Sequence, residues 1–250
     1  CLFGRDSLVI SDLLFDVKPH LRMNVIRALA LDQGSGFDSK SEEEPGRIAH
    51  EVRTMDDPVA QKLAHEGDWK FPYYGSVDAT LIWMNQIHRA AIENPSILDI
   101  VVGDKTLLER FIASTSWVLA RLDTPSGFIE LKRSNPKGIE NQVWKDSGDS
   151  YMHVNGVLAR GDSTASVETV GETYDAIMAA VAIQSIKPSN TWPLSTTELT
   201  KLARRLQLSL IAHFWMGDSF ALAVERDDAG VSVKLESMAS NQGRLLDSDV

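Results

Sequence analysis

The sequence predicts an all-α fold made of helical hairpins that follow one another along the chain. Apolar residues recur at helical spacing in six segments, and these segments group in pairs. Long polar segments separate the pairs in the first half, and the strand–helix alternation of a parallel sheet is missing. Three consecutive hairpins could form a free-standing bundle or half of a ring of six hairpins, an (α/α)6 toroid. The long polar segments at one end of the hairpins favour the half-toroid.

The boundaries of the predicted elements follow from the apolar spacing and from helix-breaking residues. Pro19 ends the first helix and Gly34 closes the second. The predicted helices span 8–17, 21–31, 79–91, 107–122, 167–186 and 199–214. Alternation at 220–224 and 231–235 around the turn 227–230 predicts a small β-hairpin, and 127–132 is a further predicted strand. The segments 34–75 and 134–166 are predicted loops, and loops of that length are usually either functional or disordered.

The composition is that of a soluble globular protein and narrows the classes of partner. Of 250 residues, 43% are hydrophobic and 24% charged, enough to build a sizeable core. The formal charge is −10 and the basic residues form no cluster, which argues against nucleic acid and anionic membranes as partners. A single cysteine excludes a disulfide framework and a multi-cysteine zinc site, and it fits a cytoplasmic setting best. No apolar run is long enough to cross a bilayer.

Polar residues with possible chemistry gather in four segments, of which the first two have simple alternatives. Arg5 and Asp6 stand directly before the first predicted helix, where an aspartate or serine could merely cap the helix. The second segment contains His50 and Glu51. A zinc-protease motif requires a second histidine four positions after the first, and Thr54 stands there, so we expect no metal site.

The third and fourth segments place aromatic residues beside carboxylates. In YYGSVDAT, Ser76 or Asp78 could start a helix and the tyrosines could pack in the core, but aromatic faces beside carboxylates also suit a sugar. In WKDSGDS the aspartates do not follow calcium-loop spacing, and a turn anchored by aspartate is the alternative. A carboxyl packed beside Trp144 would have a raised pKa, as a general acid needs, provided that Lys145 points elsewhere.

Taken together and in this order, the strings GRDSL, PGRIAHEVR, YYGSVDAT and WKDSGDS resemble the six-hairpin glycosidases of the amylo-α-1,6-glucosidase, or glycogen-debranching, type. The resemblance extends over essentially the whole chain. It implies an (α/α)6 toroid that hydrolyses α-glucosidic linkages of a glucan or oligosaccharide with inversion, without a cofactor. It also implies that residues 1–250 are part of a catalytic domain, lacking an N-terminal region and the C-terminal half of the ring.

The same resemblance assigns roles to individual residues. Asp146 would be the general acid. The residues that would bind the sugar are Arg5, Asp6, Glu51, Arg53, Tyr74, Asp78, Trp144, Lys145 and Glu168. The base carboxylate of the family lies in a later segment, outside this chain. Because inversion needs two carboxylates about 6.5–9.5 Å apart, we expect residues 1–250 alone to be inactive.

Three positions depart from the family pattern, and other classes of function stay open. Val143 replaces a glycine near the acid, Glu172 replaces a tyrosine, and Arg244 replaces a histidine, which bears on the substrate. A catalytically silent carbohydrate-binding protein is the second candidate. An epimerase or lyase on the same fold is the third, with His50 as the one histidine within a family-like motif. The oligomeric state is open, although a half-toroid would leave apolar helix faces uncovered and so favour association.

Overall fold

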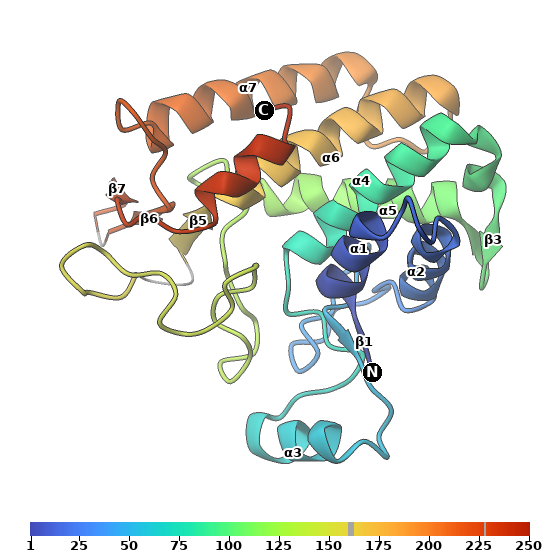
Figure 1. The fold of residues 1–250 in the computed structure, drawn as a ribbon, viewed down its shortest axis with the longest axis horizontal. Helices are drawn as coiled ribbons and strands as arrows, with labels where there is room; N and C mark the ends of the chain where they lie inside the picture. Colours follow the sequence, from blue (N-terminus) through green and yellow to red (C-terminus); the bar gives the residue numbers. More distant parts are fainter. Residues whose placement is uncertain (160–162, 228) are drawn as a thin grey trace.

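The computed structural model describes residues 1–159, 163–227 and 229–250 and is rich in helix (Figure 1). The α-helices are α1 (Gly4–Leu13), α2 (His20–Leu31), α3 (Pro58–Gly67), α4 (Asp78–Glu93), α5 (Leu107–Arg121), α6 (Val167–Ile186) and α7 (Thr196–Phe214). Two 3-10 helices are η1 (Pro95–Asp99) and η3 (Gln242–Asp247). The mostly helical fold that the sequence predicts is therefore confirmed.

Short antiparallel strands accompany the helices. Two pairs join β1 (Leu2–Phe3) to β2 (Glu51–Val52) and β3 (Val101–Val102) to β4 (Lys105–Thr106). The largest sheet has the order β5–β6–β7 and comprises β5 (Thr164–Ser166), β6 (Ala223–Arg226) and β7 (Ser232–Leu235). The predicted β-hairpin near the C-terminal end is present as β6 and β7, with β5 added along its edge.

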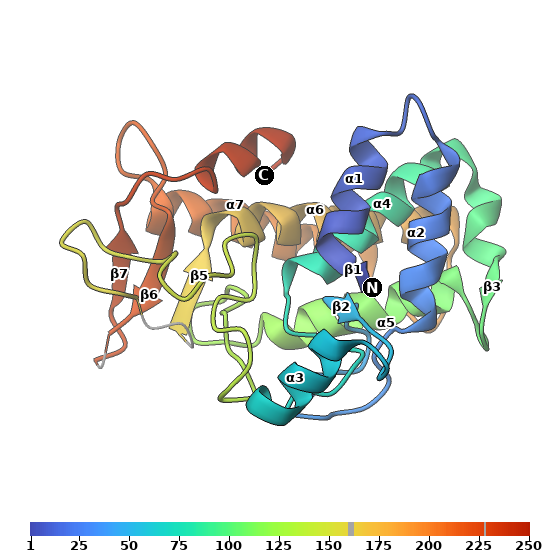
Figure 2. The same cartoon turned by 60° about the horizontal axis from the view of Figure 1, so that its bottom comes forward.

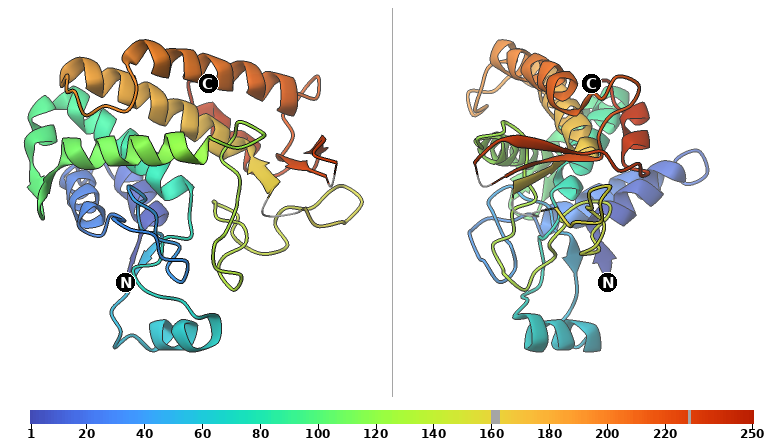
Figure 3. Two further views of the ribbon diagram at one scale, coloured as in Figure 1. Left: turned by 180° about the vertical axis from the view of Figure 1, so that it is seen from behind. Right: turned by 90° about the vertical axis from the view of Figure 1, so that its left-hand side faces the viewer.

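The helices form three successive hairpins, α1/α2, α4/α5 and α6/α7. Helix α4 packs against α1 on one side and α6 on the other, so the first helices of the hairpins are neighbours. Helices α2 and α5 pack against this row, and α7 packs against α6 (Figure 2). Loops from residues 32–57 and 122–159 gather on one side of the helices, where the N-terminus also lies (Figure 3).

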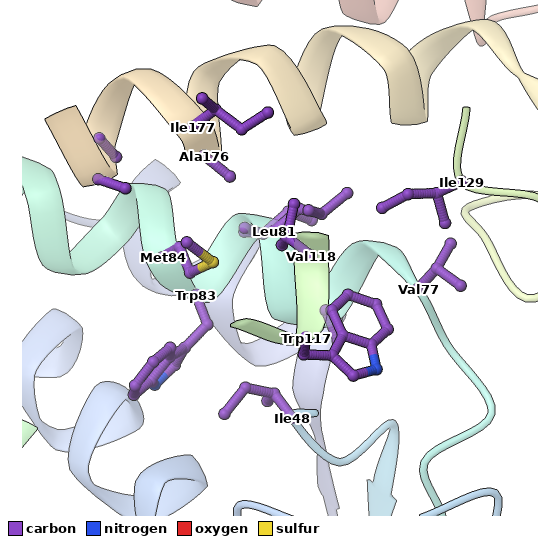
Figure 4. Close-up of a cluster of buried hydrophobic side chains, with 14 of the residues drawn as sticks. Ile48, Val77, Leu81, Trp83, Met84, Trp117, Val118, Ile129, Ala176 and Ile177 are labelled. Atoms are coloured by element: carbon purple, nitrogen blue, oxygen red, sulfur yellow. The ribbon is translucent and has the colours of Figure 1, made fainter. Parts of the chain in front are cut away.

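Helix α4 is the centre of the hydrophobic core because it is buried along most of its length. Leu81 and Met84 lie toward side chains of α5 and α6, whereas Trp83 extends toward α2 (Figure 4). The Trp83 indole N–H donates to the Ile26 carbonyl of α2 at 3.1 Å, so this large ring is both packed and hydrogen-bonded. The core thereby fixes the start of α4, which carries part of the candidate site.

Two predictions about the connecting segments are wrong. Residues 127–132 form no strand: the Thr124 hydroxyl donates to the Phe128 carbonyl at 2.8 Å, and Arg121 donates to the Glu130 carbonyl at 2.9 Å. Side chains thus satisfy carbonyls that a neighbouring strand would otherwise bind. The predicted loop 34–75 contains α3, which buries only Ala60 and is held at its start by Asp57, whose carboxylate accepts from the Val59 N–H at 2.8 Å.

The predicted turn at 227–230 is organised by Asp227, whose carboxylate accepts from the backbone N–H groups of Ala229 and Val231 at 2.9 and 2.8 Å. Asp228 lies outside the described residues. Within the described parts of the chain, every helix is too short or too polar to cross a lipid bilayer.

Candidate functional site

Arg5 in the first turn of α1 joins three segments of the chain. Its Nη1 donates to Asp78 Oδ2 at 3.0 Å, and its Nη2 donates to Asp146 Oδ2 at 3.2 Å. Asp6 lies 3.9 Å from Nε. Burial lowers the pKa of Arg5, but the carboxylates, Asp78 foremost, outweigh burial and raise it. Arg5 therefore stays charged and acts as the fixed cation of the site.

The position of Arg5 depends on a close approach of α1 to the segment after residue 48. The Gly4 N–H donates to the His50 carbonyl at 2.8 Å, and a Cβ on Gly4 would lie 2.1 Å from the Ala49 carbonyl oxygen. The capping role considered for Asp6 is wrong, because Phe3 is the N-cap residue and makes no side-chain cap. Asp6 lies inside the first turn, where a carboxylate interacts favourably with the helix dipole.

Asp78 is the first residue of α4 and is almost fully buried, at 1% exposure. Its carboxylate accepts hydrogen bonds from Arg5 and from the Ser76 hydroxyl. Ser76 Oγ in turn accepts from the Ala79 N–H at 3.3 Å, so it supports both the helix start and the carboxylate. A buried charge needs such partners, and Asp78 has two.

Trp144 and Asp146 lie on an irregular loop that faces solvent. Trp144 is 41% exposed and the Asp146 side chain 43% exposed. The Asn141 amide donates to the Ser147 carbonyl at 2.6 Å and holds this loop. The guanidinium carbons of Arg5 and Arg244 lie 5.9 and 5.7 Å from the Trp144 ring centroid, within cation–π range.

This arrangement differs from the one that we expected around Asp146. The carboxylate is not covered by Trp144; it is open to solvent and paired with Arg5. Lys145 forms no hydrogen bond or ion pair within the described residues. The turn that holds Asp146 is anchored by Asn141 rather than by an aspartate.

Glu168, in the first turn of α6, lies in the interior rather than on an open pocket wall. The carboxylate is 1% exposed and accepts from the Ser166 hydroxyl, from the Tyr151 hydroxyl at 3.1 Å and from the Asn241 amide at 2.5 Å. Burial raises the pKa of Glu168, and these hydrogen bonds oppose the rise. Sequence reasoning missed Tyr151 altogether, because one tyrosine in an irregular segment gives no pattern.

Glu172 and Arg244, which both depart from the family pattern, meet in the structure. Arg244 Nη2 donates to Glu172 Oε1 at 3.0 Å. Burial and the nearby charge of Asp78 raise the pKa of Glu172 to about 8 against the opposing effect of Arg244. Two departures that look unrelated in the sequence therefore form one ion pair beside Trp144, and their joint departure was the available signal.

Other residues with a predicted sugar-binding role are engaged elsewhere. Tyr74 is buried, and its hydroxyl donates to the Asp32 carbonyl at 2.7 Å. Glu51 pairs with Arg53, and Arg53 Nη1 also donates to Asp57 Oδ2 at 2.7 Å. Tyr74 is thus part of the core packing, whereas Glu51 and Arg53 tie β2 to the start of α3.

His50 is enclosed between aromatic rings, with Phe3 and Tyr73 in edge-on contact. Burial, and next the charge of Arg5, lower the pKa of His50. This enclosure gives little support to a lyase or epimerase reaction with His50 as the base, because a substrate could not reach the ring. The described residues contain no group of three His, Cys, Asp or Glu side chains placed to hold a metal ion.

The site as a whole combines an exposed aromatic ring, an exposed carboxylate and buried ion pairs behind them. Such a surface can stack against the C–H face of a ring-shaped polar ligand and accept hydrogen bonds from its hydroxyls. Comparison of the sequence with known protein families finds no match, and comparison with curated proteins finds no similar sequence. A functional interpretation of the site therefore depends on its geometry and on the sequence motifs around Arg5, Asp78 and Asp146.

Proposed function

We propose that Trp144 and Asp146, backed by Arg5 and Asp78, form a carbohydrate site of an inverting hydrolase that acts on α-glucosidic linkages of a glucan or oligosaccharide. The observation that carries the proposal is the exposed Asp146 carboxylate two positions from the exposed Trp144 ring, with buried Arg5 behind both. A half-toroid of three hairpins, the first half of a six-hairpin ring, is the corresponding proposal for the fold.

In the proposed reaction Asp146 is the general acid. Its carboxyl proton passes to the glycosidic oxygen as the bond from that oxygen to the anomeric carbon breaks. A water molecule attacks the anomeric carbon from the opposite face and loses its proton to a second carboxylate, so the released sugar has the β-configuration. By the family resemblance, that second carboxylate lies outside residues 1–250.

Arg5 has a specific part in this mechanism. Its guanidinium bonds Asp146 at 3.2 Å and Asp78 at 3.0 Å. A cation favours the ionised form of a carboxyl, whereas a general acid must carry a proton. Asp146 must therefore turn away from Arg5 when the substrate enters, and Arg5 then keeps Asp78 as its partner.

A reaction with azide in place of water tests the role of Asp146 as general acid, because it does not need the second carboxylate. Azide needs no deprotonation, so it can attack the anomeric carbon of an α-1,6- or α-1,4-linked gluco-oligosaccharide in place of water. We expect β-glucosyl azide from the 250-residue protein, identified by proton NMR, and a loss of about 10²–10⁴-fold in its rate of formation in Asp146→Asn. Asp149→Asn, a change of the same type at another exposed loop carboxylate, is the matched control and should keep the rate.

The ion pair between Arg5 and Asp146 also favours a second candidate, a carbohydrate-binding protein without catalysis, because Arg5 engages the carboxyl group that a general acid would present to the glycosidic oxygen. Calorimetric titration with maltotetraose separates the two. Sugar binding that is lost in Trp144→Ala, with no azide product from the unmodified protein, would select the binding protein. Neither binding nor product would overturn both candidates.

A further inference from the structure

A cavity of about 520 Å³ lies between α1, α4, α6 and η3. Arg244 lines this cavity and also lies 5.7 Å from the Trp144 ring centroid, so it separates the cavity from the loop that carries Asp146. Arg5, Asp78 and Asp146 are not among the lining residues, which makes the cavity distinct from the proposed catalytic surface. Its volume falls within the range of small-molecule sites, about 300–1,000 Å³.

Two polar side-chain atoms at this cavity are buried and have no hydrogen-bond partner. Gln86 on α4 is 4% exposed, and its Oε1 accepts no hydrogen bond. Glu172 on α6 uses Oε1 for Arg244, while its Oε2 accepts none. Buried oxygens of this kind are normally satisfied, because an unmade hydrogen bond is costly. Both atoms therefore call for a hydrogen-bond partner within the cavity.

The two arginines that line the cavity are already paired with carboxylates, which argues against an anionic ligand. Asp12 bonds Arg22 and Arg89 at 3.1 and 2.6 Å. Glu172 bonds Arg244, and Asp175 accepts from the backbone N–H of Asp249 at 3.1 Å. Gln86 Oε1 and Glu172 Oε2 still lack a hydrogen-bond partner.

The protonation of Glu172 points to hydroxyl groups as the partners of both atoms. Burial and the charge of Asp78 raise its pKa to about 8, so the protonated form dominates near neutral pH. An ammonium group matches only the ionised carboxylate, whereas a hydroxyl group can either donate to a carboxylate or accept from a carboxyl. Apolar lining residues, among them Ile82 and Met178, offer surfaces for C–H groups.

We propose that this cavity is a second ligand site, for a neutral polyhydroxylated molecule of the size of a mono- or disaccharide, with Gln86 Oε1 accepting a hydrogen bond from one of its hydroxyl groups and Glu172 Oε2 hydrogen-bonded to another. The site stands independently of hydrolysis at Asp146. Its occupant lies on the far side of Arg244 from the Trp144 ring.

Met178 allows binding to be observed within the cavity itself. The protein is labelled with 13C at the methionine methyl groups, the Met178 signal is assigned from Met178→Leu, and maltose is titrated. We expect a saturable shift of the Met178 methyl and contacts between that methyl and maltose protons in nuclear Overhauser spectra. Met55, which is exposed before α3 and away from the lining, should not shift.

A substitution at Gln86 then tests the named contact. Gln86→Leu keeps the size of the side chain and removes the acceptor, and we expect about tenfold weaker maltose binding. Gln207→Leu, the same change at a glutamine that bonds Arg204 on α7, is the control and should leave binding unchanged. If Gln86→Leu does not fold, the Overhauser contacts in the unmodified protein still decide the question.

Three results would overturn the proposal: no saturable Met178 shift, maltose affinity unaltered in Gln86→Leu, or a shift caused by putrescine and not by maltose. The Asp146→Asn variant distinguishes ligand binding in this cavity from the proposed hydrolase activity. That variant should bind maltose at Met178 like the unmodified protein even though its azide product is lost.

Discussion

Arg5 and Asp78 stand in the first turns of the neighbouring helices α1 and α4 and form a buried ion pair of 3.0 Å. The same guanidinium reaches Asp146, which lies 141 positions along the chain from Arg5. One buried cation therefore fixes the relative position of two helix starts and of the exposed loop between α5 and α6.

Replacing Arg5 with methionine should destabilise the protein strongly. The change leaves Asp78 buried without its cation, and the removal of one partner of a buried ion pair typically costs about 3–5 kcal/mol. Urea unfolding followed by circular dichroism measures the effect. Lys40→Met, which removes an ion pair with Asp68 in which both side chains are more than half exposed, should cost at most about 1 kcal/mol. Equal costs for the two variants would contradict the structural role of Arg5.

Tyr151→Phe should lower the free energy of unfolding by about 1–3 kcal/mol, because it removes a buried hydroxyl from the network that holds Glu168. That hydroxyl lies 2.8 Å from Ser166 Oγ and 3.1 Å from the Asn241 amide. Tyr174→Phe is the matched control, since its hydroxyl forms no hydrogen bond within the described residues, and it should change little. The two midpoints in urea, measured side by side, check this prediction.

Gly46→Ala should destabilise the protein by more than about 1 kcal/mol. Gly46 has φ of 87°, and a Cβ there would lie 2.2 Å from the Ala113 carbonyl oxygen of α5. A Cβ on Gly36 would have no neighbour within 4 Å, so Gly36→Ala should leave the stability nearly unchanged. Thermal unfolding compares the two variants, and an unchanged melting temperature in Gly46→Ala would contradict this close packing of the loop on α5.

Glu172 should make stability fall as the pH rises. Its pKa is raised from 4.5 to about 8 by burial and by Asp78, so the folded state binds its proton more tightly than the unfolded state does. That contribution is fully present below pH 4.5 and is lost as the pH rises through 8. Glu172→Gln should therefore show a smaller decrease in urea midpoint between about pH 5 and 8.

The test of Glu172 must account for other buried carboxyl groups, and it needs a control variant. Glu168 and Asp175, whose pKa values burial also raises, should leave a residual slope in Glu172→Gln. Glu198→Gln is the control: the pKa of Glu198 is lowered, chiefly by its hydrogen bond from Ser195, so it titrates below this range. A pH slope that is identical in Glu172→Gln and in the unmodified protein would show that Glu172 is already ionised in the folded state.

Helical periodicity predicted α2 and α4–α7 to within a few residues, because the apolar residues that these helices bury recur at helical spacing. It missed α3, whose start depends on Asp57 and Pro58 and whose burial is slight. The sequence also placed Arg5, Asp78 and Asp146 in one site, and the structure brings these three together. It could not reveal that Glu168 is enclosed, since its partners Tyr151 and Asn241 come from distant irregular segments.

The reach of Arg5 along the chain has a consequence for how the protein folds during synthesis. Arg5 is synthesised before its partner Asp146, which lies 141 positions later in the chain. In the same way, Glu168 is synthesised before its partner Asn241, which lies 73 positions later. Contacts of such long sequence separation slow folding, because the loops between them must close first. Asp78 follows Arg5 by 73 positions, so this ion pair can form before Asp146 is synthesised. We expect the complete polar cluster to assemble late, so that its hydrogen bonds report on complete folding.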